Sequence, residues 1–466
     1  MDAGIIGGKI TRYRKLLYGN VLPFWLRGGV DSEHGGIFTG LNRQGAVIEQ
    51  DKSVWFQGRA AWTFAAASIV AGTRPYAATK YRRLEETLLR AAESAESFSD
   101  RHCYDPADGR MYFRTTRDGR PLIKRRYVFS ECFAAIAKAM LARASGDADR
   151  LRRAHQLLLN VLAFLKNPAE PKMNAGVRPT SGLAPLMILI NVAQELREAH
   201  NSIYKANNSH SENLESPETL EMPEKNFYTA LIRDCIETIR TLHVKPELRC
   251  VLEQTGPAGE FLEDHFEGRL VNPGHSIEAA WFILREADYL GGHGNLIPHT
   301  ARSDPDPADT HDDRGHVART SDRRRCQEYI RLGTDILKWM LESGWDSTSG
   351  GLLYFLDAKQ EPPFEYWHDM KFWWPHSEAI IATLYAGLLT GEEGYWQWFH
   401  KIDLWSHRHF PDRDYGEWYG YLRRDGSLST SLKGNMFKGP FHIPRMYLWG
   451  LTLMTRLRND MMSKNQ

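Results

Sequence analysis

Residues 272–281 read Asn272-Pro273-Gly274-His275-Ser276-Ile277-Glu278-Ala279-Ala280-Trp281, and the rest of the chain is interpreted outward from this stretch. The Pro-Gly pair predicts a turn that opens a helix, and the residues that follow are apolar. His275 and Glu278 lie three residues apart, so they share one helix face. The pair has two interpretations: an imidazole and a carboxylate that transfer protons, or an ordinary helix N-terminus where the dipole favours a carboxylate.

The same theme recurs along the chain in six copies at irregular intervals. In most copies a glycine precedes a short aromatic run, and a turn then leads into an apolar helix that begins with polar side chains. The third copy lacks the aromatic run. The apolar helices are predicted in the segments 54–62, 127–132, 181–188, 275–284, 371–378 and 438–445.

More charged segments with helical spacing of their apolar residues lie between the copies. They cover 7–26, 76–98, 148–166, 226–243, 322–342 and 393–407. An apolar helix must be buried on all sides, whereas an amphipathic helix can cover it from outside. We therefore predict an all-α protein, an (α/α)6 barrel in which six inner helices are wrapped by six outer ones. The aromatic runs would form short β-hairpins or loops at the mouth of this barrel.

Two polar stretches interrupt the pattern, at 201–224 and 295–325. The first is rich in Ser, Asn and Glu and the second in Asp, Arg, His and Pro, so neither has much to bury. We expect both to be mobile insertions in one domain that spans residues 1–466. The second stretch contains histidines, but their spacing matches no standard metal motif.

The composition excludes several classes of protein. The net charge is +1, so we expect no nucleic-acid partner and no attraction to an anionic membrane. No run approaches the roughly 20 apolar residues that a membrane helix needs. The five cysteines are scattered without a CxxC pair, which argues against a disulfide framework and favours a reducing compartment. We expect a cytoplasmic protein.

Titratable side chains gather at the predicted starts of the inner helices, where helices of equal pitch would bring them to one mouth. They are Arg59, Glu131, His275, Glu278, His376, Glu378, His442 and Arg445. Each alone could be a cap, a core histidine or half of an ion pair. Together they favour a catalytic site, because buried charges are costly unless they are paired. The aromatic residues Trp55, Trp373, Trp374, Trp418 and Tyr421 are expected to line the same mouth.

Two imidazoles on opposite walls suit a reaction that removes a proton α to a carbonyl and returns one on the other face. Arginine can stabilise the oxyanion formed between the two steps. The chain has no Gly-rich phosphate loop and no HExxH motif, so we expect no metal. A glycosidase that uses two carboxylates on a similar barrel is the main alternative on these grounds.

The motifs resemble those of the N-acylglucosamine 2-epimerase family, whose members are also called renin-binding proteins. The matching segments occur in the family's order and span most of the chain. They are Gly36 to Phe38 with Asp51 to Arg59, Asn272 to Glu278, Phe372 to Ala379, and Lys438 to Arg445.

The resemblance implies an (α/α)6 barrel that interconverts N-acetylglucosamine and N-acetylmannosamine through the open-chain sugar and an enediolate. His275 and His442 would be the catalytic acid/base pair. The substrate-binding and supporting residues would be Arg59, Glu278, His376, Glu378, Arg445 and Trp373.

The resemblance also carries expectations outside the chemistry. No cofactor would be required, but ATP would act as an activator through Lys172 and Arg178, and the protein would be a homodimer. Three alternatives stay open: an aldose–ketose isomerase, a 2-epimerase of cellobiose, mannose or related free sugars, and a non-catalytic protein that binds a protease.

Overall fold

The computed structural model describes residues 3–73, 79–124, 128–167, 178–207, 226–293, 297 and 320–464. It is mostly helical, and its strands are two or three residues long. Within the described residues the strands form small antiparallel sheets of two or three strands and no closed β-barrel. Among those residues, no helix has both the length and the apolar character that crossing a bilayer requires.

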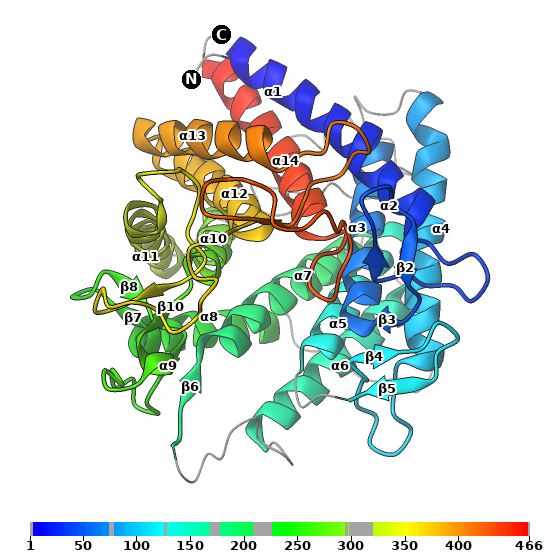
Figure 1. Cartoon of the computed structure of the whole chain (residues 1–466), viewed down its shortest axis with the longest axis horizontal. Coiled ribbons are helices and arrows are strands. Elements are labelled where there is room, and N and C mark those ends of the chain that lie inside the picture. The colour runs from blue at the N-terminus through cyan, green and yellow to red at the C-terminus, as the bar shows by residue number, and fades with distance from the viewer. Residues whose placement is uncertain are drawn as a thin grey trace.

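Six long helices occupy the interior, and each contacts the next one along the chain (Figure 1). They are α3 (Val54–Gly72), α5 (Phe129–Ser145), α7 (Leu183–Asn207), α10 (Pro273–Leu290), α12 (Trp373–Thr390) and α14 (His442–Lys464). The last of them, α14, also contacts the first, α3. Nearly every residue of α3, α5, α10 and α12 is buried, which is why their sequences are apolar all round.

Amphipathic helices cover this interior set, each packing on an inner helix. They are α1 (Ala3–Leu16), which continues through the π-helix η1 (Leu17–Val21) into α2 (Leu22–Gly28), then α4 (Thr79–His102), α6 (Ala148–Lys166), α8 (Phe227–Thr238) with the π-helix η2 (Ile239–His243), α11 (Thr320–Gly344) and α13 (Glu393–His409). In α4 the buried residues Leu88, Ala92, Ala95 and Phe98 form one stripe. The predicted outer segments are therefore confirmed to within a few residues at each end.

Short strands precede most of the inner helices. One sheet pairs β3 (Lys52–Ser53), β4 (Arg114–Thr115) and β5 (Pro121–Ile123). The remaining strands form pairs: β1 (Gly40–Leu41) with β2 (Val47–Glu49), β6 (Ser181–Gly182) with β9 (Gln254–Thr255), β7 (Val244–Lys245) with β8 (Cys250–Val251), β10 (Leu270–Val271) with β11 (Leu356–Asp357), and β12 (Lys371–Phe372) with β13 (Tyr421–Leu422). A one-turn helix, α9 (Phe266–Arg269), precedes β10.

A repeated ion triad joins neighbouring copies of the repeat. In the first copy Asp31 accepts from Lys52 Nζ at 2.9 Å and from Arg117 Nε at 2.9 Å. The arginine belongs to the next hairpin, so the triad fastens one copy to its neighbour. Gly35, four residues after the aspartate, has φ 77°, which favours glycine in this turn.

The triad recurs in the second half of the chain. Asp346 binds Lys371 at 2.9 Å and Arg424 at 3.0 Å. Asp412 binds Lys433 at 3.2 Å, and its arginine, Arg43 at 2.8 Å, comes from the first copy. The last copy is thus fastened to the first by a contact between residues 369 positions apart.

The two predicted insertions are shorter than the sequence indicated. Helix α7 extends to Asn207, so residues 201–207 are helical, and α11 begins at Thr320, so residues 320–325 are helical too. Ile297, which also belongs to the second predicted insertion, is buried and accepts a hydrogen bond from Arg143. Residues 208–225, 295–296 and 298–319 lie outside the described residues.

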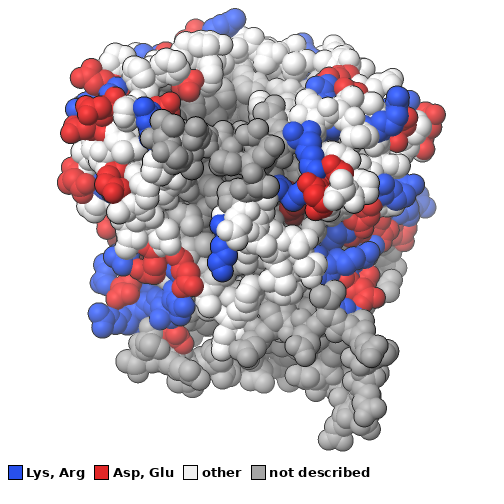
Figure 2. Space-filling view, turned by 90° about the horizontal axis from the view of Figure 1, so that it is seen from below, with Lys and Arg blue, Asp and Glu red and all other residues white. Residues whose placement is uncertain are grey.

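The surface in Figure 2 carries basic and acidic side chains intermingled along its flanks. Neither sign forms a continuous patch among the residues coloured there, as expected for a chain with a net charge of +1. That face therefore presents no one-signed field that would attract a polyanion.

Candidate active site

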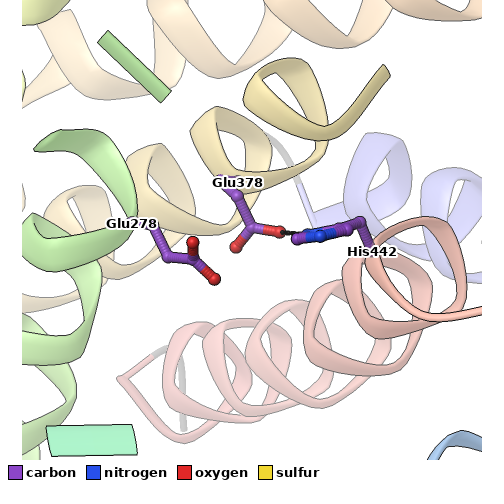
Figure 3. Close-up of side chains that lie close together, drawn as sticks. All are labelled: Glu278, Glu378 and His442. Atoms are coloured by element: carbon purple, nitrogen blue, oxygen red, sulfur yellow. Dashed lines mark hydrogen bonds and ion pairs between the residues drawn. The ribbon is translucent and has the colours of Figure 1, made fainter. Parts of the chain in front are cut away.

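Three inner helices bring a histidine and two glutamates together (Figure 3). Glu278 comes from α10, Glu378 from α12, and His442 from the first residue of α14. His442 Nδ1 lies 2.7 Å from Glu378 Oε1, and the ligand atoms of all three side chains lie within 4.8 Å of one another. The structure thus brings these three predicted residues close together, although they come from helices far apart in the sequence.

Arg445 lies between the two carboxylates. It is one helical turn after His442, and its Nη2 lies 2.7 Å from Glu378 Oε1 and donates to Glu278 Oε1. Although burial opposes it, the two carboxylates raise the pKa of Arg445. Three such side chains could hold a metal ion, but here the guanidinium supplies the positive charge between the carboxylates.

Glu378 makes a second hydrogen bond from its other oxygen. Trp281 Nε1 donates to Glu378 Oε2 at 2.8 Å. The glutamate is fully buried, and burial raises its pKa while Arg445 and the Trp281 hydrogen bond act in the opposite direction. The carboxylate is therefore fixed in orientation, and it fixes the imidazole of His442 in turn.

His275 is backed by a carboxylate that the sequence did not indicate. Its Nδ1 lies 3.1 Å and 3.0 Å from the two carboxylate oxygens of Glu253, in the turn between β8 and β9. Burial acts to lower the pKa of His275, but the charge and hydrogen bond of Glu253 outweigh it and raise that pKa. The prediction that Glu278 backs His275 was wrong, because Glu278 turns toward Arg445 instead.

The start of α10 also shows an ordinary cap. The side-chain oxygen of Asn272 accepts from the backbone N–H of His275 at 3.1 Å, and Pro273 follows at the first helical position. The cap interpretation is therefore confirmed for this stretch, and the proton-transfer interpretation stays a prediction. The capping role belongs to Asn272, which leaves the imidazole free for other contacts.

Both histidines pack on the same indole. The ring of Trp374 lies 5.1 Å from the His275 ring and 5.7 Å from the His442 ring, centre to centre. Gly274 makes this packing possible, because a Cβ there would lie 2.4 Å from an atom of Trp374. The two imidazoles, one from α10 and one from α14, thus lie against the same side chain.

The two imidazoles have opposite electrostatic surroundings. Burial, together with the positive charges of Arg445 and Arg59, holds the pKa of His442 well below its usual value. The pKa of His275 is raised. Environments that shift the pKa values of two titratable groups in opposite directions are typical of an acid and a base that work together.

Arg59 approaches the same site from α3. Burial lowers its pKa to about 9, while Glu278 and Glu378 act in the opposite direction. Its Nη1 donates to the Phe437 carbonyl at 3.4 Å, and its guanidinium lies 4.2 Å from the Phe133 ring centre. No carboxylate forms a direct ion pair with it among the described residues, so its charge is available to a ligand.

His376 does not belong to the site. Its Nδ1 lies 2.7 Å from the Phe372 carbonyl, its Nε2 accepts from the Leu352 N–H at 2.9 Å, and its ring stacks on Trp405. Burial lowers its pKa to about 3. Since both ring nitrogens are used by the backbone, His376 is a neutral structural residue, and its predicted substrate-binding role was wrong.

The remaining predicted residues either support the site or lie away from it. Trp373 packs behind His442 at 6.3 Å and is only 2% exposed, so it supports the imidazole. Trp418 stacks on Phe410 away from the site, and Glu131 pairs with Arg110 at 2.6 Å. These two were wrongly placed at the mouth.

The predicted effector residues are only partly described. Arg178 is exposed, with its Nη1 3.9 Å from Glu267 Oε2. Lys172 lies outside the described residues.

Known proteins resemble this chain along nearly its whole length. A family model described as N-acylglucosamine 2-epimerase matches residues 36–302 and 316–441. The N-acylglucosamine 2-epimerase of Bos taurus is 32% identical over 451 residues, which is 95% of this chain and 90% of that protein. That of Homo sapiens is 33% identical over 430 residues, 91% of this chain and 85% of that protein. The crystal structure of a sugar epimerase from a ruminal bacterium matches with a TM-score of 0.70 at 19% identity, covering 96% of this chain and 99% of that one, and shows likeness of fold.

Proposed function

This chain belongs to the N-acylglucosamine 2-epimerase family, and from that premise we propose that it interconverts N-acetylglucosamine and N-acetylmannosamine by proton transfer at C2. One observation carries the proposal at the level of chemistry. Two imidazoles with opposite pKa shifts pack on one indole, from different helices, at 5.1 Å and 5.7 Å. That arrangement supplies a base and an acid to two sides of one carbon.

His442 is the base in the resting protein. Its Nδ1–H donates to Glu378, so Nε2 carries the lone pair, and its lowered pKa keeps the ring neutral. His275 is the acid, because its Nδ1–H donates to Glu253 and its raised pKa favours a proton on Nε2. Neither Nε2 has a protein hydrogen-bond partner among the described residues.

The chemical steps balance with these two groups alone. His442 removes the C2 proton of the open-chain sugar. The C–H electron pair becomes the C1–C2 double bond and the π pair of the aldehyde moves onto O1, which gives an enolate that keeps the acetamido group on C2. His275 then delivers a proton to the opposite face of C2, which inverts the configuration. In the reverse direction the two imidazoles exchange roles.

Two arginines stabilise the oxyanion that forms between these steps. Arg59 and Arg445 carry positive charge next to the compartment, and fixed charges placed where negative charge develops lower a barrier. Glu278 and Glu378 hold Arg445 in place from both sides. Trp281 and Glu253 orient the groups that touch the sugar.

The fold that carries this site is, we propose, a closed (α/α)6 barrel. Support comes from the contacts of each inner helix with the next, from α14 returning to α3, and from the ion triad between Asp412 and Arg43. The histidines would then lie at one end of the barrel, where the inner helices begin.

Three further properties are proposed on the family resemblance. The chemistry needs no cofactor, ATP acts as an activator near the exposed Arg178, and the protein is a cytoplasmic homodimer. All five cysteines are free and four of them are buried, which suits a reducing compartment. Activity with and without ATP, and the mass of the protein in solution, test these points.

Epimerisation in heavy water, followed by proton NMR, tests the proposed reaction. With two bases the product gains deuterium at C2 while the remaining substrate keeps its proton early in the reaction. A His442→Ala variant is expected to react more slowly by a factor of about 10²–10⁴, the usual contribution of one acid/base group. His400→Ala, an exposed histidine on α13, is the matched control. A ketose product would indicate the isomerase alternative, and no C2 exchange with any sugar would overturn the proposal.

A further inference from the structure

A second cavity lies behind the wall that carries His275. Its volume is about 600 Å³, a usual size for a small-molecule site. It is formed where the β7–β8 turn, strands β10 and β11 and the C-terminal turn of α11 meet, at the left of Figure 1. Neither histidine lines it, so it is separate from the site described above.

Two strands of the cavity wall lead directly to the acid group. Cys250 of β8 lines the cavity, and Glu253, the partner of His275, follows three residues later. Val271 of β10 lines it too, and the next residue is Asn272, which caps the helix that His275 enters. The backbone N–H of Glu253 donates to the Leu270 carbonyl at 3.1 Å, so the turn after β8 is joined directly to β10.

A third segment of the wall separates the cavity from Trp374. Leu353 and Phe355 line the cavity, while Tyr354 between them lies against Trp374 with ring centres 6.0 Å apart. Alternate residues of an extended chain point to opposite faces. One segment therefore presents one face to the cavity and the other to the indole that both histidines contact.

The lining suits a neutral sugar. Two half-buried aromatic side chains, Trp339 and Phe355, offer flat apolar faces for the C–H side of a pyranose. Sugar hydroxyls both donate and accept, so they can use carboxylates and guanidiniums alike. The charged residues of the lining are Arg249, Glu342, Asp357, Glu361, Asp369 and Arg424. Because carboxylates outnumber guanidiniums there, an anionic ligand such as a nucleotide fits the cavity less well.

We propose that this cavity binds a second sugar molecule, which acts on the epimerase site through the shared wall. The lining residues alone indicate that the ligand is a sugar. That this sugar is the enzyme's own substrate or product rests on the proposed function. The bound sugar would stiffen the segments that carry Glu253, Asn272 and Tyr354. Turnover would then depend on sugar concentration in a way that one site cannot produce.

Calorimetric titration with N-acetylglucosamine tests the proposal. The protein used is His442→Gln, which we expect to bind the sugar without converting it. We expect two sugars per chain, and we expect Trp339→Ala in this background to weaken the second binding event at least fivefold. Ser343→Phe is the second variant, because it fills the cavity from its exposed rim without removing a packed side chain. Trp398→Ala, a half-buried tryptophan of the outer helix α13, is the matched control.

The outcomes separate this proposal from the proposed function. One sugar per chain, or two that neither cavity variant affects, would overturn it, as would displacement of the second sugar by ATP. Deuterium exchange is measured separately with the wild-type protein. A chain that binds two sugars but exchanges none would refute the epimerase and leave the cavity site supported.

Discussion

Replacing Glu253 by glutamine removes one charge while keeping the shape of the side chain. In the wild type both carboxylate oxygens lie within 3.1 Å of His275 Nδ1, and the Glu253 side chain is only 13% exposed. The amide oxygen of glutamine can still accept from Nδ1–H, so the ring orientation is expected to persist. What changes is the electrostatic support for the protonated imidazole.

The size of the effect follows from this geometry. Two unit charges 3 Å apart interact by about 5–6 kcal/mol at an effective dielectric constant of 20. The His275 side chain is 30% exposed, so solvent screens part of this charge–charge interaction. Opposite charges at such distances usually shift a pKa by about 1–3 pH units. We expect the pKa of His275 to fall by about 1–2 pH units in the variant, about 1.4 kcal/mol for each unit.

The sign of the activity change is then fixed. His275 must be protonated to act as the acid, so a lower pKa moves the alkaline limb of kcat/KM toward lower pH. The variant should lose activity on the alkaline side of the profile, by up to about tenfold for each pH unit that the limb moves, and most of that loss should disappear on the acidic side. The assay is epimerisation between pH 5 and pH 9 in both directions, from N-acetylglucosamine and from N-acetylmannosamine, because His275 is the acid in one direction and the base in the other. The alkaline limb should move in the direction in which His275 is the acid.

The control is Glu247→Gln, which removes an exposed carboxylate from the β7–β8 turn a few residues away. It should leave the profile unchanged. An equal loss of activity at every pH would mean that Glu253 only holds the loop in place. An alkaline limb that stayed fixed or moved upward would refute the assignment of His275 as the acid.

The remaining predictions concern buried groups away from the reaction. His376→Gln keeps a donor for the Phe372 carbonyl and an acceptor for the Leu352 N–H, so we expect activity within about threefold of wild type. Because the folded pKa of His376 is about 3, the unfolded chain takes up a proton below about pH 6.5 that the native protein does not. Native stability therefore falls with acidification by about 1.4 kcal/mol per pH unit, and urea unfolding should show this slope reduced in the variant. Lys371→Met leaves Asp346 with Arg424 as its one cationic partner among the described residues, and it should cost about 3 kcal/mol of unfolding free energy. A change below about 0.5 kcal/mol would show that the ion triad is dispensable.

The sequence by itself determined the order of the helices, and it singled out the two histidines that we propose as the acid/base pair. Apolar and amphipathic segments differ in local composition and spacing, and that pattern indicates which faces of a helix are buried. His275 and His442 were identified because they begin helices that the repeat had already located. The predicted insertion at 201–224 began too early, because its first residues continue α7 although they have little to bury.

Only the tertiary structure decided which side chains pair. Glu253 lies 22 residues before His275, and nothing local indicates that the two meet. His376 stands in the same helical position as a site residue, yet the backbone takes both its nitrogens. Long-range pairing depends on how separate elements dock, and the free energy of docking is spread over contacts between distant segments. The link from Asp412 back to Arg43 shows the same principle, because it joins residues 369 positions apart in the chain.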